Sequence, residues 1–140
     1  MSMKIMIVDP DWYFLSQARG ILEDCGHQVA QQSDPAEAME RAAQWRPDVI
    51  LANVELPEVS DGELLGQFAA IRPRPAILLV SALDRFDKAW HAWQRGGDEV
   101  LFKPILHPSE LHVAIRVARE NALCPEKRPA ADRFPLAISA

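Results

Sequence analysis

Short apolar runs recur along the chain between residues 4 and 121, and turn-forming or charged residues bound them. A continuous apolar run of this kind is typical of a strand that is buried on both faces of a parallel sheet. The run Val49–Ala52, between Asp48 and Asn53, is the clearest example. Strands are therefore predicted at 5–8, 27–31, 48–53, 76–80 and 99–102.

The stretches between these runs carry apolar residues at every third or fourth position, which is the spacing of a helix with one buried face. Asp11, Asp34 and Asp61 stand where the first three of these stretches begin. Aspartate is a preferred N-cap residue, so each of the three is expected to start a helix. Helices are predicted over residues 12–24, 35–45, 61–71, 84–95 and 108–121.

Strands and helices thus alternate five times, which is the pattern of successive βαβ units. Because such crossovers are right-handed, we predict an α/β fold with a single doubly wound five-stranded parallel sheet over residues 4–121. Three prolines interrupt the pattern after Asn121. Residues 122–140 are therefore predicted to form a flexible, Pro-containing C-terminal tail, whose apolar segment 134–138 is a candidate for docking into a groove.

The composition narrows the class of protein. The 140 residues are 49% hydrophobic, which suits one globular domain. A formal net charge of −5 gives no general attraction to nucleic acid or to anionic lipid. No apolar run approaches the roughly 18 residues of a membrane span, and no signal-peptide pattern opens the chain. Cys25 and Cys124 lack metal or redox spacing, so we expect a cytoplasmic protein with reduced thiols and no nucleic-acid or membrane partner.

Four polar residues stand at the carboxyl ends of predicted strands: Asp9, Asn53, Ser81 and Lys103. Parallel strands end at the same edge of a sheet, and ligands bind in the crevice outside that edge. We therefore expect these four side chains to lie close together and to form the functional site.

At this point the segment 4–121 resembles the receiver domain of response regulators, the phosphoacceptor module of bacterial two-component signalling. The resemblance rests on short motifs in a fixed order. These motifs are Ile7-Val8-Asp9, the run from Asp48 to Asn53, Leu56-Pro57, Asp61-Gly62, Ser81-Ala82, Gly96-Gly97-Asp98 and Lys103-Pro104. It implies a flavodoxin-like (βα)5 sheet with strand order 2-1-3-4-5.

The resemblance also implies a chemistry for the site. Two adjacent acids after the first strand would hold Mg²⁺ together with an acceptor aspartate, which takes a phosphoryl group from a histidine kinase. A serine or threonine and a lysine would then bind the phosphoryl oxygens. Asp9 matches the first acid, Ser81 the hydroxyl and Lys103 the lysine, and the Lys103-Pro104 bond would be cis.

The functional prediction is based on the positions where this sequence differs from the family pattern. Asn53 stands at the acceptor position, Pro10 at the second acid, and Val100 where an aromatic switch residue is usual. A carboxamide is a poor nucleophile, and an uncharged oxygen is a weak Mg²⁺ ligand. With Asp9 and Lys103 summing to zero charge, we expect the degenerate metal site to stay empty and no cofactor to be needed. Lys103 is predicted to bridge Asp9 and Asn53.

The sequence thus predicts a stand-alone pseudo-receiver that is not an enzyme and acts by phosphorylation-independent protein–protein interaction. The expected partner is a histidine kinase or another signalling protein, bound at the face formed by the helix 84–95, the strand 99–102 and the last helix. Trp90 and Trp93 are contact candidates there, although core packing is the favoured role for this aromatic stripe. A homodimer is also possible from the sequence. The alternatives are a phosphoacceptor that uses another carboxylate, such as Asp9 or Glu55, and a small-ligand sensor that uses the strand-end crevice.

Overall fold

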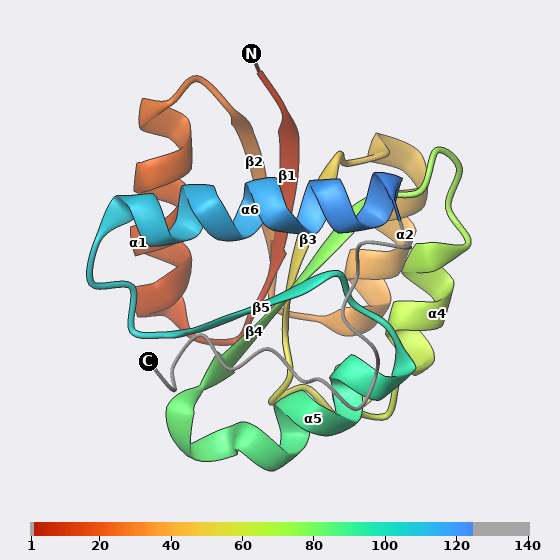
Figure 1. Cartoon of the computed structure of the whole chain (residues 1–140). Coiled ribbons are helices and arrows are strands. Elements are labelled where there is room, and N and C mark those ends of the chain that lie inside the picture. Colours follow the sequence, from red (N-terminus) through yellow and green to blue (C-terminus); the bar gives the residue numbers. More distant parts are fainter. Residues whose placement is uncertain (1, 125–140) are drawn as a thin grey trace.

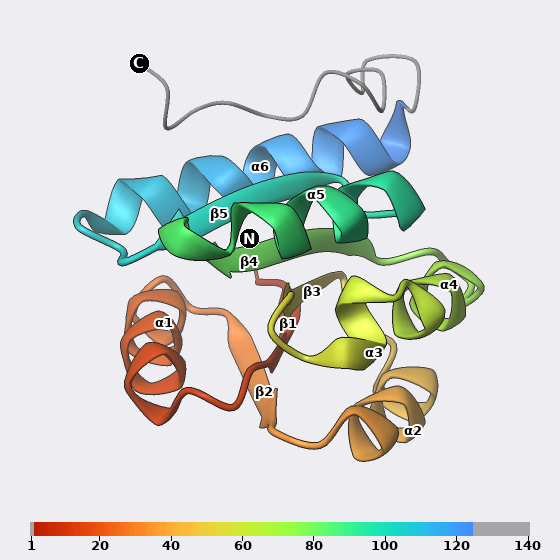
Figure 2. The same ribbon diagram turned by 90° about the horizontal axis from the view of Figure 1, so that it is seen from below.

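The computed structural model of the protein describes residues 2–124, and their fold is a five-stranded parallel sheet with helices on both faces (Figures 1 and 2). The strands are β1 (Lys4–Val8), β2 (Gln28–Gln32), β3 (Val49–Asn53), β4 (Ala76–Ala82) and β5 (Glu99–Lys103). The helices are α1 (Trp12–Asp24), α2 (Pro35–Trp45), α3 (Pro57–Ser60), α4 (Glu63–Ala69), α5 (Phe86–Arg95) and α6 (Pro108–Leu123), with a 3-10 turn η1 (Leu83–Arg85). No helix within residues 2–124 is long and apolar enough to cross a membrane.

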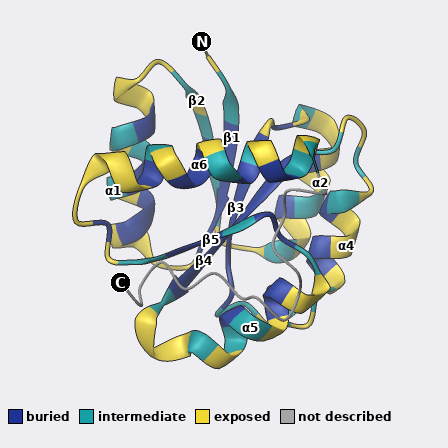
Figure 3. Cartoon of the chain, in the orientation of Figure 1, coloured by how far each residue is buried: buried dark blue, intermediate teal, exposed yellow. Residues whose placement is uncertain are grey.

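The predicted sheet is confirmed. Its strand order is β2-β1-β3-β4-β5, and every neighbouring pair is parallel. All five residues of β3 are buried, as expected for a strand covered on both faces. Figure 3 shows the buried interior of the sheet and the exposed outer faces of the helices. One hydrophobic cluster lies under α1 and α6, and the other lies under α2, α4 and α5.

The chain after β3 differs from the prediction, because Asp61 does not cap a helix. Pro57 starts the extra helix α3, and Asp61 is the residue that ends it. The chain then turns through Gly62, whose φ of 84° is in the left-handed region, and Gly62 takes the N-cap position of α4. A Cβ atom at Gly62 would overlap the side chain of Arg95, so glycine suits this turn in two ways.

Two helix boundaries also differ from the expected ones. The segment predicted as a helix from Asp84 begins with η1, and the α-helix itself starts at Phe86. The last helix continues to Leu123, beyond the expected end near Asn121. The predicted tail from residue 125 onward lies outside the described residues.

The aromatic stripe of α5 packs mainly inward. Trp93 is completely buried in the cluster under α2, α4 and α5, whereas Trp90 and Phe86 are partly buried against the same cluster. The favoured core role is therefore confirmed for Trp93. A completely buried side chain is not available for contact with a partner, so only Trp90 remains as a candidate from this pair.

His27 makes the stability of the fold depend on pH. Its Nδ1 accepts the backbone N–H of Met3 at 3.1 Å. Partial burial, followed by the charge of His112, lowers the pKa of His27 from its ordinary 6.5. Below pH 6.5 the unfolded chain therefore binds more protons at this site than the folded chain. The stability contributed by neutral His27 is present above this pH and is lost as the pH falls through the lowered pKa.

Replacing His27 by asparagine tests this dependence. His27→Asn keeps an acceptor for Met3 but removes the titrating group. We expect the melting temperature to fall less between about pH 7 and pH 5 in this variant than in the natural chain. Thermal melts followed by circular dichroism measure the difference, and parallel curves for the two proteins would show that His27 is not responsible.

Candidate functional site

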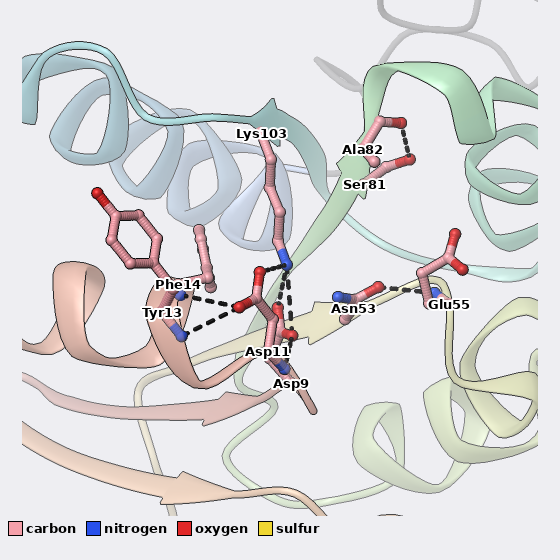
Figure 4. Close-up of polar contacts among 9 residues, drawn as sticks. All are labelled: Asp9, Asp11, Tyr13, Phe14, Asn53, Glu55, Ser81, Ala82 and Lys103. Atoms are coloured by element: carbon pink, nitrogen blue, oxygen red, sulfur yellow. Dashed lines mark hydrogen bonds and ion pairs between the residues drawn. The ribbon is translucent and has the colours of Figure 1, made fainter.

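All four predicted side chains lie at the carboxyl edge of the sheet. Asp9 follows β1, Asn53 ends β3, Ser81 lies near the end of β4 and Lys103 ends β5. The first three are at most 3% exposed. Figure 4 shows Lys103 reaching down to Asp9, Asn53 beside this pair, and Ser81 turned toward the chain that follows it.

The centre of the site is the ion pair between Lys103 and Asp9. Lys103 Nζ lies 3.0 Å from Asp9 Oδ2 and 3.4 Å from Oδ1, and Asp9 Oδ1 also accepts the backbone N–H of Asp11 at 2.8 Å. The ammonium lies 4.5 Å from the centre of the Phe14 ring, where a cation is favoured by the ring face. The predicted Asp9–Lys103 pairing is therefore present, in a setting where both charges have several partners.

Asp11 is the site residue that sequence reasoning missed. It caps α1 as predicted, because its Oδ1 accepts the N–H groups of Tyr13 and Phe14. Its Oδ2, however, lies 3.2 Å from Lys103 Nζ. Burial would raise the pKa of Asp11, but the hydrogen bonds from Lys103, Phe14 and Tyr13 together lower it.

This second carboxylate changes the charge of the site. Asp9, Asp11 and Lys103 sum to −1, because two negative groups face one positive group. The expected neutral pocket is thus wrong, since that sum counted only Asp9 and Lys103. The sequence did contain a signal for this second carboxylate. Asp11 stands immediately after Pro10, one position beyond the place where the family has its second acid.

Asn53 does not take part in the lysine contacts. Its Oδ1 accepts the backbone N–H of Glu55 at 2.7 Å. No hydrogen bond joins Asn53 and Lys103 among residues 2–124, so the predicted bridge to Asn53 is wrong. The amide oxygen instead accepts a hydrogen bond from the backbone two residues further on, which is a common role of asparagine in turns. In Figure 4 the amide nitrogen, a donor, is on the side that faces Asp9 and Asp11.

Ser81 and Glu55 both contact the segment that follows Ser81 in the chain. Ser81 Oγ donates to the carbonyl of Ala82 at 2.8 Å and lies 3.4 Å from that of Arg85. The Glu55 carboxylate lies 3.2 Å from Arg85 Nε and 3.9 Å from Lys88 Nζ. The Glu55 contacts connect the loop after β3 to η1 and to the start of α5. The serine hydroxyl is used by backbone carbonyls of its own segment.

The residues present do not fit the Mg²⁺ ion that the resemblance implies. The Lys103 ammonium lies within 3.2 Å of both carboxylates and so takes the position that a cation would need. Asn53 directs its oxygen to Glu55, and one oxygen of Asp11 is used by the helix cap. Mg²⁺ requires near-octahedral oxygen ligands and gives up water reluctantly. Within residues 2–124 there is also no group of three His, Cys, Asp or Glu side chains arranged to hold a metal.

Comparisons with known proteins agree with this fold. The response regulator receiver domain family matches residues 5–116. The alkaline phosphatase synthesis transcriptional regulatory protein PhoP of Bacillus subtilis is 30% identical over 117 residues, which are 83% of this chain and 48% of PhoP. The chemotaxis protein CheY of Listeria monocytogenes is 24% identical over 73% of this chain and 87% of CheY. The chain thus spans about half the length of PhoP and most of CheY.

Solved structures show the same fold. A response regulator receiver domain protein from Clostridium thermocellum superposes with a TM-score of 0.71 at 25% identity, covering 84% of this chain and 94% of that one. NtrX from Brucella abortus, in complex with ADP, gives a TM-score of 0.77 at 21% identity, over 91% of this chain and 28% of NtrX. With the family match over residues 5–116, the chain belongs to the response regulator receiver domain family.

Proposed function

We propose that this receiver domain acts through contact with a protein partner and does not accept a phosphoryl group. Receiver domains are modules of two-component signalling rather than enzymes in the ordinary sense. The observation that carries the proposal is Asn53 at the end of β3, where the family has its acceptor aspartate. The lone pair of an amide nitrogen is delocalised, and the amide oxygen of Asn53 already accepts the N–H of Glu55.

The contacts around Asn53 support a state that needs neither metal nor phosphoryl group. Lys103 supplies a positive charge to Asp9 and Asp11 from within the chain. Ser81 is satisfied by backbone carbonyls, and Glu55 is paired with Arg85. Each group that would bind a phosphoryl oxygen in the family thus has a partner from the chain itself. We infer a site held in one arrangement.

The partner contact is proposed on the face formed by α5, β5 and α6. The rings of Phe86 and Phe102 stack there with their centres 5.9 Å apart, and both are only partly buried. Trp90 is a partly buried neighbour, and Val113 of α6 is 48% exposed. Aromatic side chains at the margin of a core are the type that dominates protein interfaces. The partner class that fits is a histidine kinase or another signalling protein.

The alternative acceptors have less support. Asp9 is 1% exposed and is paired with Lys103, which hinders attack by its oxygens on an external phosphoryl donor. Glu55 is more accessible, but Arg85 and Lys88 neutralise it. No contact in the site favours either carboxylate as a nucleophile over the role it has in the fold.

Acetyl phosphate tests the proposal without a kinase. The protein is incubated with acetyl phosphate and Mg²⁺, quenched in acid and weighed by intact mass spectrometry. We expect an unchanged mass, because no activated carboxylate is present at the acceptor position. A receiver domain with an acceptor aspartate serves as the positive control. A product about 80 Da heavier that disappears in mild base would contradict the proposal.

A further inference from the structure

A groove of about 390 Å³ lies between β5 and the first half of α6. Its lining is mainly apolar and contains two acidic residues. The apolar lining includes Leu101, Phe102, Val113 and Ala114, and the acidic residues are Glu99 and Glu110. The groove belongs to the face that we propose for the partner, and in that respect the inference below rests on the proposed function.

In the described part of the chain, the sheet ends beside this groove. β5 is the last strand in the order, so its outer side pairs with no strand within residues 2–124. Glu99 accepts the N–H of Val100 at 2.9 Å but has no ion pair with a described residue. Burial raises the pKa of Glu99. A partly buried carboxylate beside this apolar groove is suited to a ligand that is apolar and brings one cation.

We propose that the groove binds residues 133–138 of this same chain. Their sequence is Arg133-Phe134-Pro135-Leu136-Ala137-Ile138. Large apolar residues stand at every second position, so an extended segment would present Phe134, Leu136 and Ile138 on one face. Arg133, immediately before them, is the cation that would pair with Glu99. The two features that the groove requires therefore occur together in this segment.

The chain is long enough to make this contact. α6 ends at Leu123, which is ten positions beyond Val113, or about 15 Å along the helix. The eight residues 125–132 span up to about 28 Å when extended. A segment tethered at this distance has an effective concentration in the millimolar range, so a weak contact suffices. Bound in the groove, it would compete with any partner for the α5–β5–α6 face.

Hydrogen exchange on the full chain tests the contact without a partner or a phosphoryl donor. The natural protein is compared with the variant Phe134→Ser/Leu136→Ser/Ile138→Ser, and Ala130→Ser/Ala131→Ser is the matched control. We expect the amides of residues 99–103 and 109–114 to exchange about tenfold faster in the triple variant, with the control behaving as the natural chain. Equal exchange in all three proteins at these amides would overturn the proposal.

Charge reversal tests the pairing of Arg133 with Glu99. Arg133→Glu is expected to increase exchange in the same segments, and Glu99→Arg/Arg133→Glu is expected to restore protection. If the double variant does not restore protection from exchange, then Arg133 does not pair with Glu99. Protection that grows with protein concentration would show that a second copy supplies the segment, which also overturns the intramolecular contact. The proposed function is tested separately. If acetyl phosphate leaves the mass of the protein unchanged, the proposed function holds whether or not the segment binds in the groove.

Discussion

Replacing Lys103 by methionine is expected to lower the free energy of unfolding by about 3 kcal/mol, because it leaves two carboxylates facing each other without their cation. Lys103 Nζ is the group that lies within 3.2 Å of both Asp9 and Asp11. Asp9 is 1% exposed, so water cannot replace the lost charge effectively. Methionine keeps most of the side-chain length, which limits the loss of packing against Phe14.

The same variant is expected to gain a response to Mg²⁺ that the natural chain lacks. With the ammonium removed, Asp9 and Asp11 supply two charged oxygens to the vacated position. A site with a dissociation constant of about 1 mM would add about 1.4 kcal/mol of stability at about 10 mM Mg²⁺. In the natural protein Lys103 already holds this position, and the same Mg²⁺ should leave its stability unchanged.

Urea unfolding with and without Mg²⁺, followed by tryptophan fluorescence, measures both effects. Lys88→Met is the matched control, because Lys88 is more exposed and lies 3.9 Å from Glu55. An exposed pair of this kind contributes about 0–1 kcal/mol, so this control should stay close to the natural chain. The account of Lys103 as an internal cation fails if both lysine variants are equally stable, or if Mg²⁺ stabilises the natural chain as well.

Asn53→Asp is expected to make the protein accept a phosphoryl group from acetyl phosphate. The new carboxylate would stand at the end of β3 beside Asp9 and Asp11. The four side chains would then sum to −2, from three acids and Lys103, and this charge attracts Mg²⁺. A carboxylate can act as a nucleophile toward phosphorus, which the carboxamide cannot.

Intact mass under acid quench gives the labelled fraction directly. Asn53→Asp should yield a species about 80 Da heavier in the presence of Mg²⁺, while Asn53→Ala and the natural chain should yield none. Labelling of the natural chain at the level of Asn53→Asp would show that another residue is the acceptor. If Asn53→Asp itself stays unlabelled, then the ion pairs of Lys103 with Asp9 and Asp11 block the chemistry even when the nucleophile is present.

The fold was predictable because its signals are local and repeated. The apolar run Val49–Ala52 predicts a strand that is buried on both faces, and all five residues of β3 are buried. Strand ends in a parallel sheet share one edge, so the meeting of Asp9 with Lys103 followed from topology alone. Asp11 and Asp34 cap α1 and α2 as predicted, since capping depends on neighbours in sequence.

The predictions that were wrong concern helix boundaries and the partners of single side chains. The amide oxygen of Asn53 was expected to accept from Lys103, but it accepts from the N–H of Glu55, a donor that is much nearer in sequence. Asp11 both caps α1 and contacts Lys103, and the second role depends on the position of β5 in space. Asp61 precedes Gly62, and the Arg95 side chain against that glycine is not visible in the local sequence. Sequence patterns specify which elements form, but competing partners decide the final hydrogen bonds.

The central claim is that Asn53 leaves this receiver domain without a phosphoacceptor, and the most direct test is the mass of the protein from cells that make it naturally. The chain is purified under acid quench from cells in several growth states and weighed intact. We expect only the unmodified mass in every state. A stoichiometric species about 80 Da heavier that is lost in mild base would contradict it.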